Sequence, residues 1–413
     1  YLTSQAALHY LASGRREEGL PRLRRVLAET GIHWPRTRTR AWLSVLWRLV
    51  TLAASGARHR LTDVSVPTHF DGRGRTAERL FPDADEQPDD RVKVEMLLAG
   101  AALVPPYDFA RGAYFITAFA RRALLLGDRE RVPIALGMLS VLFIASRLTA
   151  AIGRRLGEEA VALARAAPPS LLTSAALSFA AFGRLRAGAL KEALDLGIES
   201  ERALHGSDRT HAYEAWTARA VQCFALTLMG RVGEAADLFA ATGREARELG
   251  DELAALGGES PIRYLVRDDV DSAVELVERK RAALGQIGHE GVVHQIVLMD
   301  RITCALYQGR GGEVLPLFRE SVTAGLVTID AHALPAHCAL QAIGHGPATP
   351  ALRRIVLRAS RLLIRERLLA PRALAAQLRA ALCVIDHDEA GALAQISIAA
   401  DVYAQAGMRL HEA

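Results

Sequence analysis

A glycine followed five residues later by another small residue, between two apolar runs, is the feature that most restricts the fold of this chain. In "ALTLMGRVGEAADLF" these two residues are Gly230 and Ala235. Apolar residues follow the glycine at i, i+3, i+4 and i+7, a spacing that predicts one face of an amphipathic helix. They are Val232, Ala235, Ala236 and Phe239. Because glycine adopts positive φ at little cost, we expect one helix to end at Gly230 and another to begin just after it, with Ala235 at the crossing.

The same spacing recurs along the chain. Its other copies pair Gly14 with Gly19, Gly188 with Ala193, Asp268 with Ala273, and Gly309 with Val314. The copies at 188, 230, 268 and 309 are 42, 38 and 41 residues apart, intervals that are typical of stacked helix pairs. Weaker copies surround Gly127, Gly157 and the segment "IDHDEAGALAQ". The alternation typical of strands is nearly absent; its best example, 325–340, also fits a loop and a helix. We predict an all-α chain, built as an α-solenoid.

A solenoid also accounts for the length. A chain of 413 residues with 50% hydrophobic residues would otherwise suggest two or three domains of about 150 residues each, whereas the core of a solenoid grows lengthwise. We expect N-terminal helices of the solenoid over 1–55 and the main helical-repeat stack over 91–413. Between them, 56–90 contains three prolines, several glycines and an acidic end. We expect an irregular connection there, with a short helix at 76–81.

Charge does not favour a nucleic-acid partner. The formal net charge is +5, from 51 basic and 46 acidic residues. Residues 1–80 hold fourteen Arg against six Asp or Glu, and the cluster of Arg22, Arg24 and Arg25 could meet phosphates. No aromatic residues interleave with this cluster as platforms for base stacking, so we attribute the arginines to solvated helix faces and predict no nucleic-acid binding.

Cysteine spacing and hydropathy favour a cytoplasmic chain without a membrane partner. The four cysteines are well separated and form no C-x-x-C pair, which is typical of buried thiols in a reducing compartment: Cys223, Cys304, Cys338 and Cys383. The opening "YLTSQAALHY" has no basic and then apolar signal segment. The longest uncharged apolar run, 132–146, is shorter than the roughly 20 residues that cross a bilayer and contains Pro133 and Gly137. We expect a buried helix there.

Two histidine motifs invite comparison with zinc sites. "HEGVVH" resembles H-E-x-x-H, but His289 and His294 are five residues apart, about 140° around a helix, whereas zinc needs ligands at i and i+4. "HALPAHC" offers His332, His337 and Cys338, with Pro335 between them and no second ligand pair. We predict helix packing for both motifs, and no metal site.

Other local patterns also lack the residues that chemistry requires. "DGRGRT" at 71–76 has no lysine for a phosphate-binding loop, and no G-x-S-x-G elbow is present. The acidic cluster at 83–90 could bind a cation, although we favour a solvated loop: it holds Asp83, Asp85, Glu86, Asp89 and Asp90. Glu192 and Glu234 recur at one repeat position, where a carboxylate favours the positive end of a helix dipole. We predict no catalytic, cofactor-binding or metal-binding residue.

With these repeats identified, the chain resembles the C-terminal helical region of large bacterial serine/threonine protein kinases that carry an AAA-type ATPase module. Single units such as "LMGRVGEAADLFAAT" look like degenerate tetratricopeptide repeats. Four stretches carry the likeness: "AALHYLASGRREEGLPRLRRVLAETGIHWPRTRTRAWLSVLWRL", "PPYDFARGAYFITAFARRALLLGDRERVPIAL", "FALTLMGRVGEAADLF" and "AADVYAQAGMRLHEA". The chain departs from the family within 56–90, where the connection is longer and less regular, and it has none of the Gly-rich, H-R-D, D-F-G or Walker motifs of the parent.

The resemblance implies a role rather than a reaction. In such proteins the tail looks like a sensor or docking platform, which receives a protein partner on its concave surface and acts on the catalytic modules of the parent. ATP and Mg would then belong to those modules, and no activity is expected from this segment. Two alternatives stay open. One is a free-standing tetratricopeptide adaptor, and the other is the sensory region of a LuxR-like ATPase transcription regulator, since similar helical regions follow ATPase modules there.

Overall fold

The computed structural model describes residues 6–7, 9–11, 13, 15–61, 90–144, 148–204, 212–287, 291–319, 328–365 and 368–408. Every regular element in these ranges is a helix, which confirms the all-α prediction. The first of them are α2 (Arg16–Glu29), α3 (Arg38–Ser55), α4 (Asp90–Leu103), α5 (Phe109–Leu126), α6 (Arg131–Phe143), α7 (Ala150–Ala166), α8 (Leu171–Arg186), α9 (Leu190–Leu204) and α10 (Ala212–Leu228). The others are α11 (Val232–Glu248), α12 (Glu252–Gly258), α13 (Ile262–Leu265), α14 (Val270–Ile287), α15 (Val292–Tyr307), α16 (Gly311–Val314), the 3₁₀ helix η2 (Leu315–Arg319), α17 (Thr328–Gly344), α18 (Pro350–Arg365), α19 (Leu369–Ile385) and α20 (Glu389–Ala406).

The predicted turns share one backbone geometry. Gly188, Gly230 and Gly309 have φ of 75°, 76° and 73°, and Asp268 takes the same left-handed region at 58°. The amide of Gly230 donates a hydrogen bond to the carbonyl of Thr227 (3.0 Å), and the amide of Arg231 donates one to the carbonyl of Leu226 (2.9 Å). These two hydrogen bonds define a Schellman motif. The helix after it begins at Val232, as predicted. The small residues five positions on are buried: Ala193, Ala235, Ala273 and Val314.

The weaker turn predictions have mixed outcomes. Gly127 ends α5 with φ of 69°, and His387, inside "IDHDEAGALAQ", ends α19 with φ of 57°. The prediction at Gly157 is wrong, because this glycine lies inside α7, where a Cβ would be 3.5 Å from Ser140 of α6. Gly250, which was not predicted, makes a further turn at φ of 69°. This turn falls inside the 38-residue interval between Gly230 and Asp268, and two short helices, α12 and α13, follow it.

Two apolar segments form helices. Residues 328–344 make α17 around Pro335, so the strand-like pattern at 325–340 belongs, in its described part, to a helix. The run at 132–146 supplies α6, which is buried over most of its length, as predicted. In the described ranges, no helix has the length and apolar character needed to cross a membrane. Most of the expected connection, 62–89, lies outside the described residues, together with the helix expected at 76–81 and the 71–76 motif.

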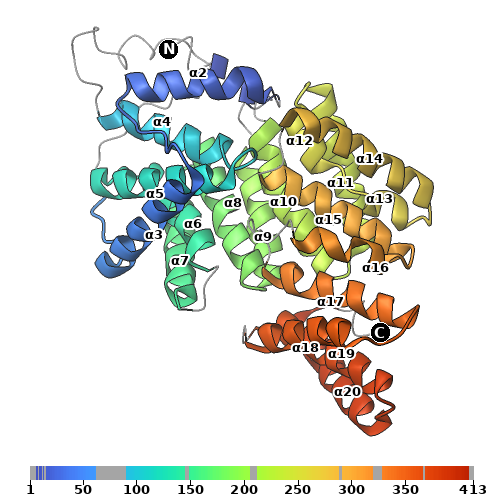
Figure 1. The fold of residues 1–413 in the computed structure, drawn as a ribbon. Helices are drawn as coiled ribbons and strands as arrows, with labels where there is room; N and C mark the ends of the chain where they lie inside the picture. Colours follow the sequence, from blue (N-terminus) through green and yellow to red (C-terminus); the bar gives the residue numbers. More distant parts are fainter. Residues whose placement is uncertain are drawn as a thin grey trace.

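Consecutive helices pair, and the pairs pack side by side (Figure 1). The first helices of the pairs contact one another in succession, and we name them the first-helix row: α6, α8, α10, α12, α15, α17 and α19. The second helices α7, α9, α11 and α18 instead contact their own partner and the first helix that follows. The row packs closely; a Cβ on Gly137 of α6 would lie 3.0 Å from the carbonyl oxygen of Ala176 on α8. One contiguous cluster of buried apolar side chains therefore extends from Ala7 to Met408.

Candidate docking site

The sequence-derived metal candidates do not form a metal centre in the described part of the chain. His294 lies on α15, whereas His332, His337 and Cys338 lie on α17. His289 falls outside the described residues, as does the acidic cluster except Asp90, which pairs with Arg122 of α5. Among the described residues, no group of three or more His, Cys, Asp or Glu could hold a metal ion.

The cysteines are placed as hydrophobic side chains rather than nucleophiles. Cys223, Cys304 and Cys338 are buried, and Cys383 is half-buried. Burial raises the pKa of Cys304 and of Cys338 to about 12, and it also raises the pKa of Cys223. Because the thiolate is the reactive form, burial disfavours reaction of these thiols.

The recurrent glutamates and the early arginines are held by local partners. Glu192 and Glu234 lie in the first turns of α9 and α11, as predicted, and pair with Arg184 (3.2 Å) and Arg231 (2.6 Å). Two arginines of the basic cluster stack on aromatic rings. The guanidinium carbon of Arg22 lies 4.6 Å from the centroid of Tyr10, and that of Arg24 lies 4.7 Å from the centroid of Trp34.

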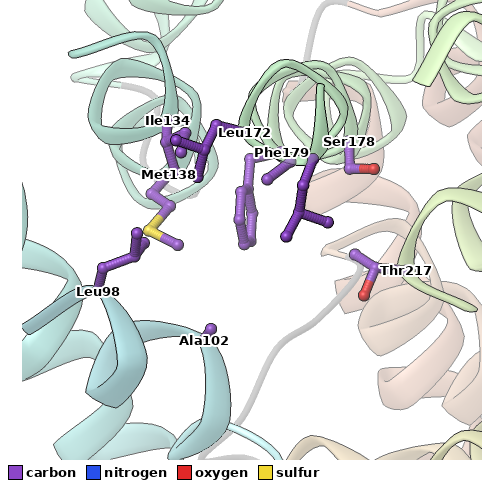
Figure 2. A pocket seen from close by; sticks show the side chains of 10 residues that line it. Leu98, Ala102, Ile134, Met138, Leu172, Ser178, Phe179 and Thr217 are labelled. Atoms are coloured by element: carbon purple, nitrogen blue, oxygen red, sulfur yellow. The ribbon is translucent and has the colours of Figure 1, made fainter. Parts of the chain in front are cut away.

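An apolar hollow opens between four helices, of which three belong to the first-helix row (Figure 2). Its cavity volume is about 60 Å³, within about 530 Å³ of unfilled space that includes open solvent. Its walls come from α4, α6, α8 and α10: Leu98, Ala102, Ile134, Met138, Leu171, Leu172, Ala175, Ser178, Phe179 and Thr217. We name this site the α8 hollow, since α8 supplies half of the residues. Figure 2 shows Phe179 between Met138 and the hydroxyl-bearing Ser178 and Thr217.

Local sequence explains the position of α8. Ser170 caps the helix, because its hydroxyl accepts a hydrogen bond from the amide of Thr173 at 3.1 Å. Buried small residues, Ser174, Ala176, Ala180 and Ala181, let α8 approach its neighbours closely. Among the described residues, no charged side chain lines the hollow. It is therefore suited to an apolar side chain rather than to a charged substrate.

A second, polar hollow lies between α14, α15 and α16, with a cavity volume of about 310 Å³ within about 750 Å³ of unfilled space that includes open solvent. Its rim carries both charge signs, from Glu278, Arg301, Arg310 and Glu313, and the last two lie 3.7 Å apart. Cys304 is at its wall and is protonated near neutral pH, as described above. The mixed rim selects for neither anions nor cations, so this hollow is the weaker candidate.

A buried lysine on α14 is engaged in a structural ion pair. The Nζ atom of Lys280 lies 2.5 Å from the carboxylate of Asp300 and donates to the carbonyl of Glu259 at 2.6 Å. Burial raises the pKa of Asp300 in spite of the nearby ammonium. A lysine held by two acceptors in this way ties α14 to α15 and to the end of α12.

Sequence reasoning missed the α8 hollow. Its residues come from segments between Leu98 and Thr217, and each of these segments has the apolar pattern of an ordinary core helix. The signal is spatial, not local. No protein-family model, curated protein or solved structure matches this chain. The likeness to kinase tails therefore stays a prediction.

Proposed function

We propose that this chain is a non-catalytic docking and regulatory region, built as an α-solenoid of degenerate tetratricopeptide-like helix pairs. The observation that carries the proposal is the α8 hollow, an apolar recess on the first-helix row. A protein partner would insert an apolar anchor there, since buried apolar anchors supply most of the affinity of protein interfaces.

The packing of the rows supports the solenoid. First helices contact one another from α6 to α19, whereas second helices contact mainly their neighbours in sequence. A stack in which one row is packed more closely than the other curves toward the close row, and repeat proteins use such concave surfaces for binding. We infer that the first-helix row lines the concave side and that the α8 hollow lies on it.

We also propose, from the resemblance of the four stretches, that the region belongs to a bacterial serine/threonine kinase with an ATPase module. Its partners would then include the kinase and ATPase modules themselves. Sequencing the coding DNA in frame on both sides tests this part. Kinase and Walker motifs would support it; a start codon directly before Tyr1 would favour the free-standing adaptor, and a following helix-turn-helix would favour the regulator.

Site-specific photocrosslinking tests docking. A photoreactive amino acid at Thr217, in the α8 hollow, should crosslink one defined protein in cells that express the gene naturally, and the same amino acid at exposed Glu158 of α7 should not. With that partner purified, Ala175→Trp fills the hollow and should weaken binding about tenfold or more, whereas Glu158→Trp should leave affinity unchanged. Equal crosslinking at both positions would refute the site. Turnover of ATP or phosphorylation by the purified chain would refute the non-catalytic role.

A further inference from the structure

Helix α3 exposes an apolar stripe. Leu43, Leu46, Trp47 and Val50 are between 57% and 70% exposed, and their spacing of i, i+3, i+4 and i+7 places them on one helix face, which exposed Ala54 extends by one turn. The opposite face, with Ala41, Val45 and Leu52, is buried, and α3 packs on α5. We name the exposed residues the α3 stripe.

Helix α20 exposes a shorter apolar stripe, in which the i+4 position is the exposed polar residue Ser397. Leu393 is 69% exposed and Ile396 is 51% exposed, and half-buried Ala400 and exposed Ala404 continue the face at i+7 and i+11. The other face of α20 holds its buried residues, which pack against α19: Ala392, Ala399, Val402 and Tyr403. We name the exposed residues the α20 stripe. In both stripes the side chains are large in the N-terminal half and small at the C-terminal end.

The two chain segments that carry the stripes have opposite charges. No Asp or Glu occurs between Glu29 and Asp63, and exposed arginines lie near both ends of α3, at Arg36, Arg40, Arg58 and Arg60. Conversely, α20 contains no Lys or Arg and carries Glu389 in its first turn and Asp401 near its end, both exposed. Each apolar face therefore has a partner of complementary charge in the same sequence.

We propose that the α3 stripe of one copy of this chain packs antiparallel on the α20 stripe of a second copy. Antiparallel packing sets Leu43, Leu46 and Trp47 against the small residues of α20, and large-to-small contact fills the interface. It also brings Arg36 and Arg40 toward Asp401, and Arg58 and Arg60 toward Glu389. Pairing of two α3 stripes would instead bring like charges together.

Helices α3 and α20 lie far apart in one molecule (Figure 1), so their stripes cannot cover each other within it. The contact between copies is heterologous: in an open assembly, the copy at each end still presents one unused stripe. Repetition of such a contact closes into a ring or continues as an open chain, depending on the rotation between copies.

Sedimentation velocity of the 413-residue chain over a wide concentration range tests the proposal. The wild type should associate, and Trp47→Glu or Leu393→Glu should each lower the association constant at least about tenfold. Leu148→Glu is the matched control, since Leu148 is 93% exposed and lies outside both stripes. Circular dichroism would establish that each variant keeps its helix content.

Mixing the two variants tests the heterologous geometry. Trp47→Glu retains the α20 stripe and Leu393→Glu retains the α3 stripe, so an equimolar mixture should form dimers and nothing larger. A wild type that stays monomeric at every concentration would overturn the proposal, as would undiminished association of Leu393→Glu alone. Trp47-dependent binding to phosphatidylserine vesicles without self-association would also overturn it and identify α3 as a membrane-binding surface.

Discussion

The region from α4 to α8 and the region from α18 to α20 use similar helices in different surroundings. In α6, eleven of thirteen residues are buried, because α5, α7 and α8 all pack on it. In α20, only four of eighteen residues are buried, because α19 supplies nearly all of its contacts. The comparison teaches that the number of neighbouring helices sets how much of a helix is buried, and we expect its contribution to stability to follow.

Breaking a buried ion pair should reveal the difference between the two regions with the largest change in the free energy of unfolding. Arg131 of α6 is fully buried between Glu95 and Asp128, and its Nη1 lies 2.9 Å from Asp128; desolvation raises the pKa of Glu95 despite this partner. Arg131→Met leaves two buried carboxylates without their cation, so it should lower the free energy of unfolding by about 3–5 kcal/mol. Arg353→Met removes the half-exposed pair with Asp386 and should cost less than about 1 kcal/mol. Urea unfolding followed by circular dichroism compares them; equal costs would contradict the comparison.

Leucine truncation gives the next effect. Leu139 in α6 is fully buried, so Leu139→Ala should destabilise the protein by about 2–5 kcal/mol through lost burial and a cavity. Leu393 in α20 is largely exposed, and Leu393→Ala should change stability by no more than about 0.5 kcal/mol in dilute solution. Hydrogen exchange measured on peptides from α6 and α20 checks this: Leu139→Ala should speed exchange in α6, whereas Leu393→Ala should leave exchange in α6 unchanged. A cost above that limit for Leu393→Ala would show that α20 is covered in the monomer.

Asp251, between the two regions, gives a pH dependence. Its carboxylate caps α12 by accepting from the amide of Ala254 at 2.8 Å, and burial raises its pKa to about 6. Because the folded-state pKa lies above the unfolded value, this group favours folding below about pH 4 and loses that contribution as the pH rises through about 6. Asp251→Asn keeps the cap without the charge, so relative to it the wild type should lose about 2–3 kcal/mol between about pH 4 and pH 7. A pH-independent difference in urea midpoint would show that Asp251 does not titrate in this window.

Turn residues give the smallest effect. His387 holds a left-handed φ of 57° before α20, where Gly230 holds 76° before α11. His387→Gly should stabilise the end of the stack by up to about 1 kcal/mol, whereas Gly230→Ala should destabilise the centre by about the same amount. Urea midpoints measure both changes. The same sign for the two substitutions would show that the shared turn geometry does not control them.

The turns were the most predictable part of the fold, because the left-handed residue and the buried small residue lie five positions apart in one local segment. Gly250 escaped prediction because α12 has seven residues, too few to show a stripe. Gly157 misled because a glycine also serves close helix packing, here against Ser140. Local spacing does not distinguish these two uses.

The exposed surfaces were harder to predict than the core. In α3, apolar residues occur on both the buried and the exposed face, so periodicity does not show which face other helices cover. The α8 hollow depends on the relative placement of four helices, which no single segment encodes. The prediction that the chain has no catalytic nucleophile rests on missing motifs. The structure adds only that burial raises the pKa of the Cys304 and Cys338 thiols.

The succession of contacts between neighbouring pairs also determines the response to mechanical load. If the two ends are pulled apart, much of the force passes through successive interfaces, because most helix contacts join neighbours in the sequence. The hydrogen bond from the amide of Val292 to the carbonyl of Pro105 also bridges distant segments. The weakest interface should yield first, and α20, anchored on one side, should peel from α19 before α6 leaves its neighbours. Extension would then proceed in steps of one helix or one pair. The molecule would unfold in several stages under load rather than in one cooperative event.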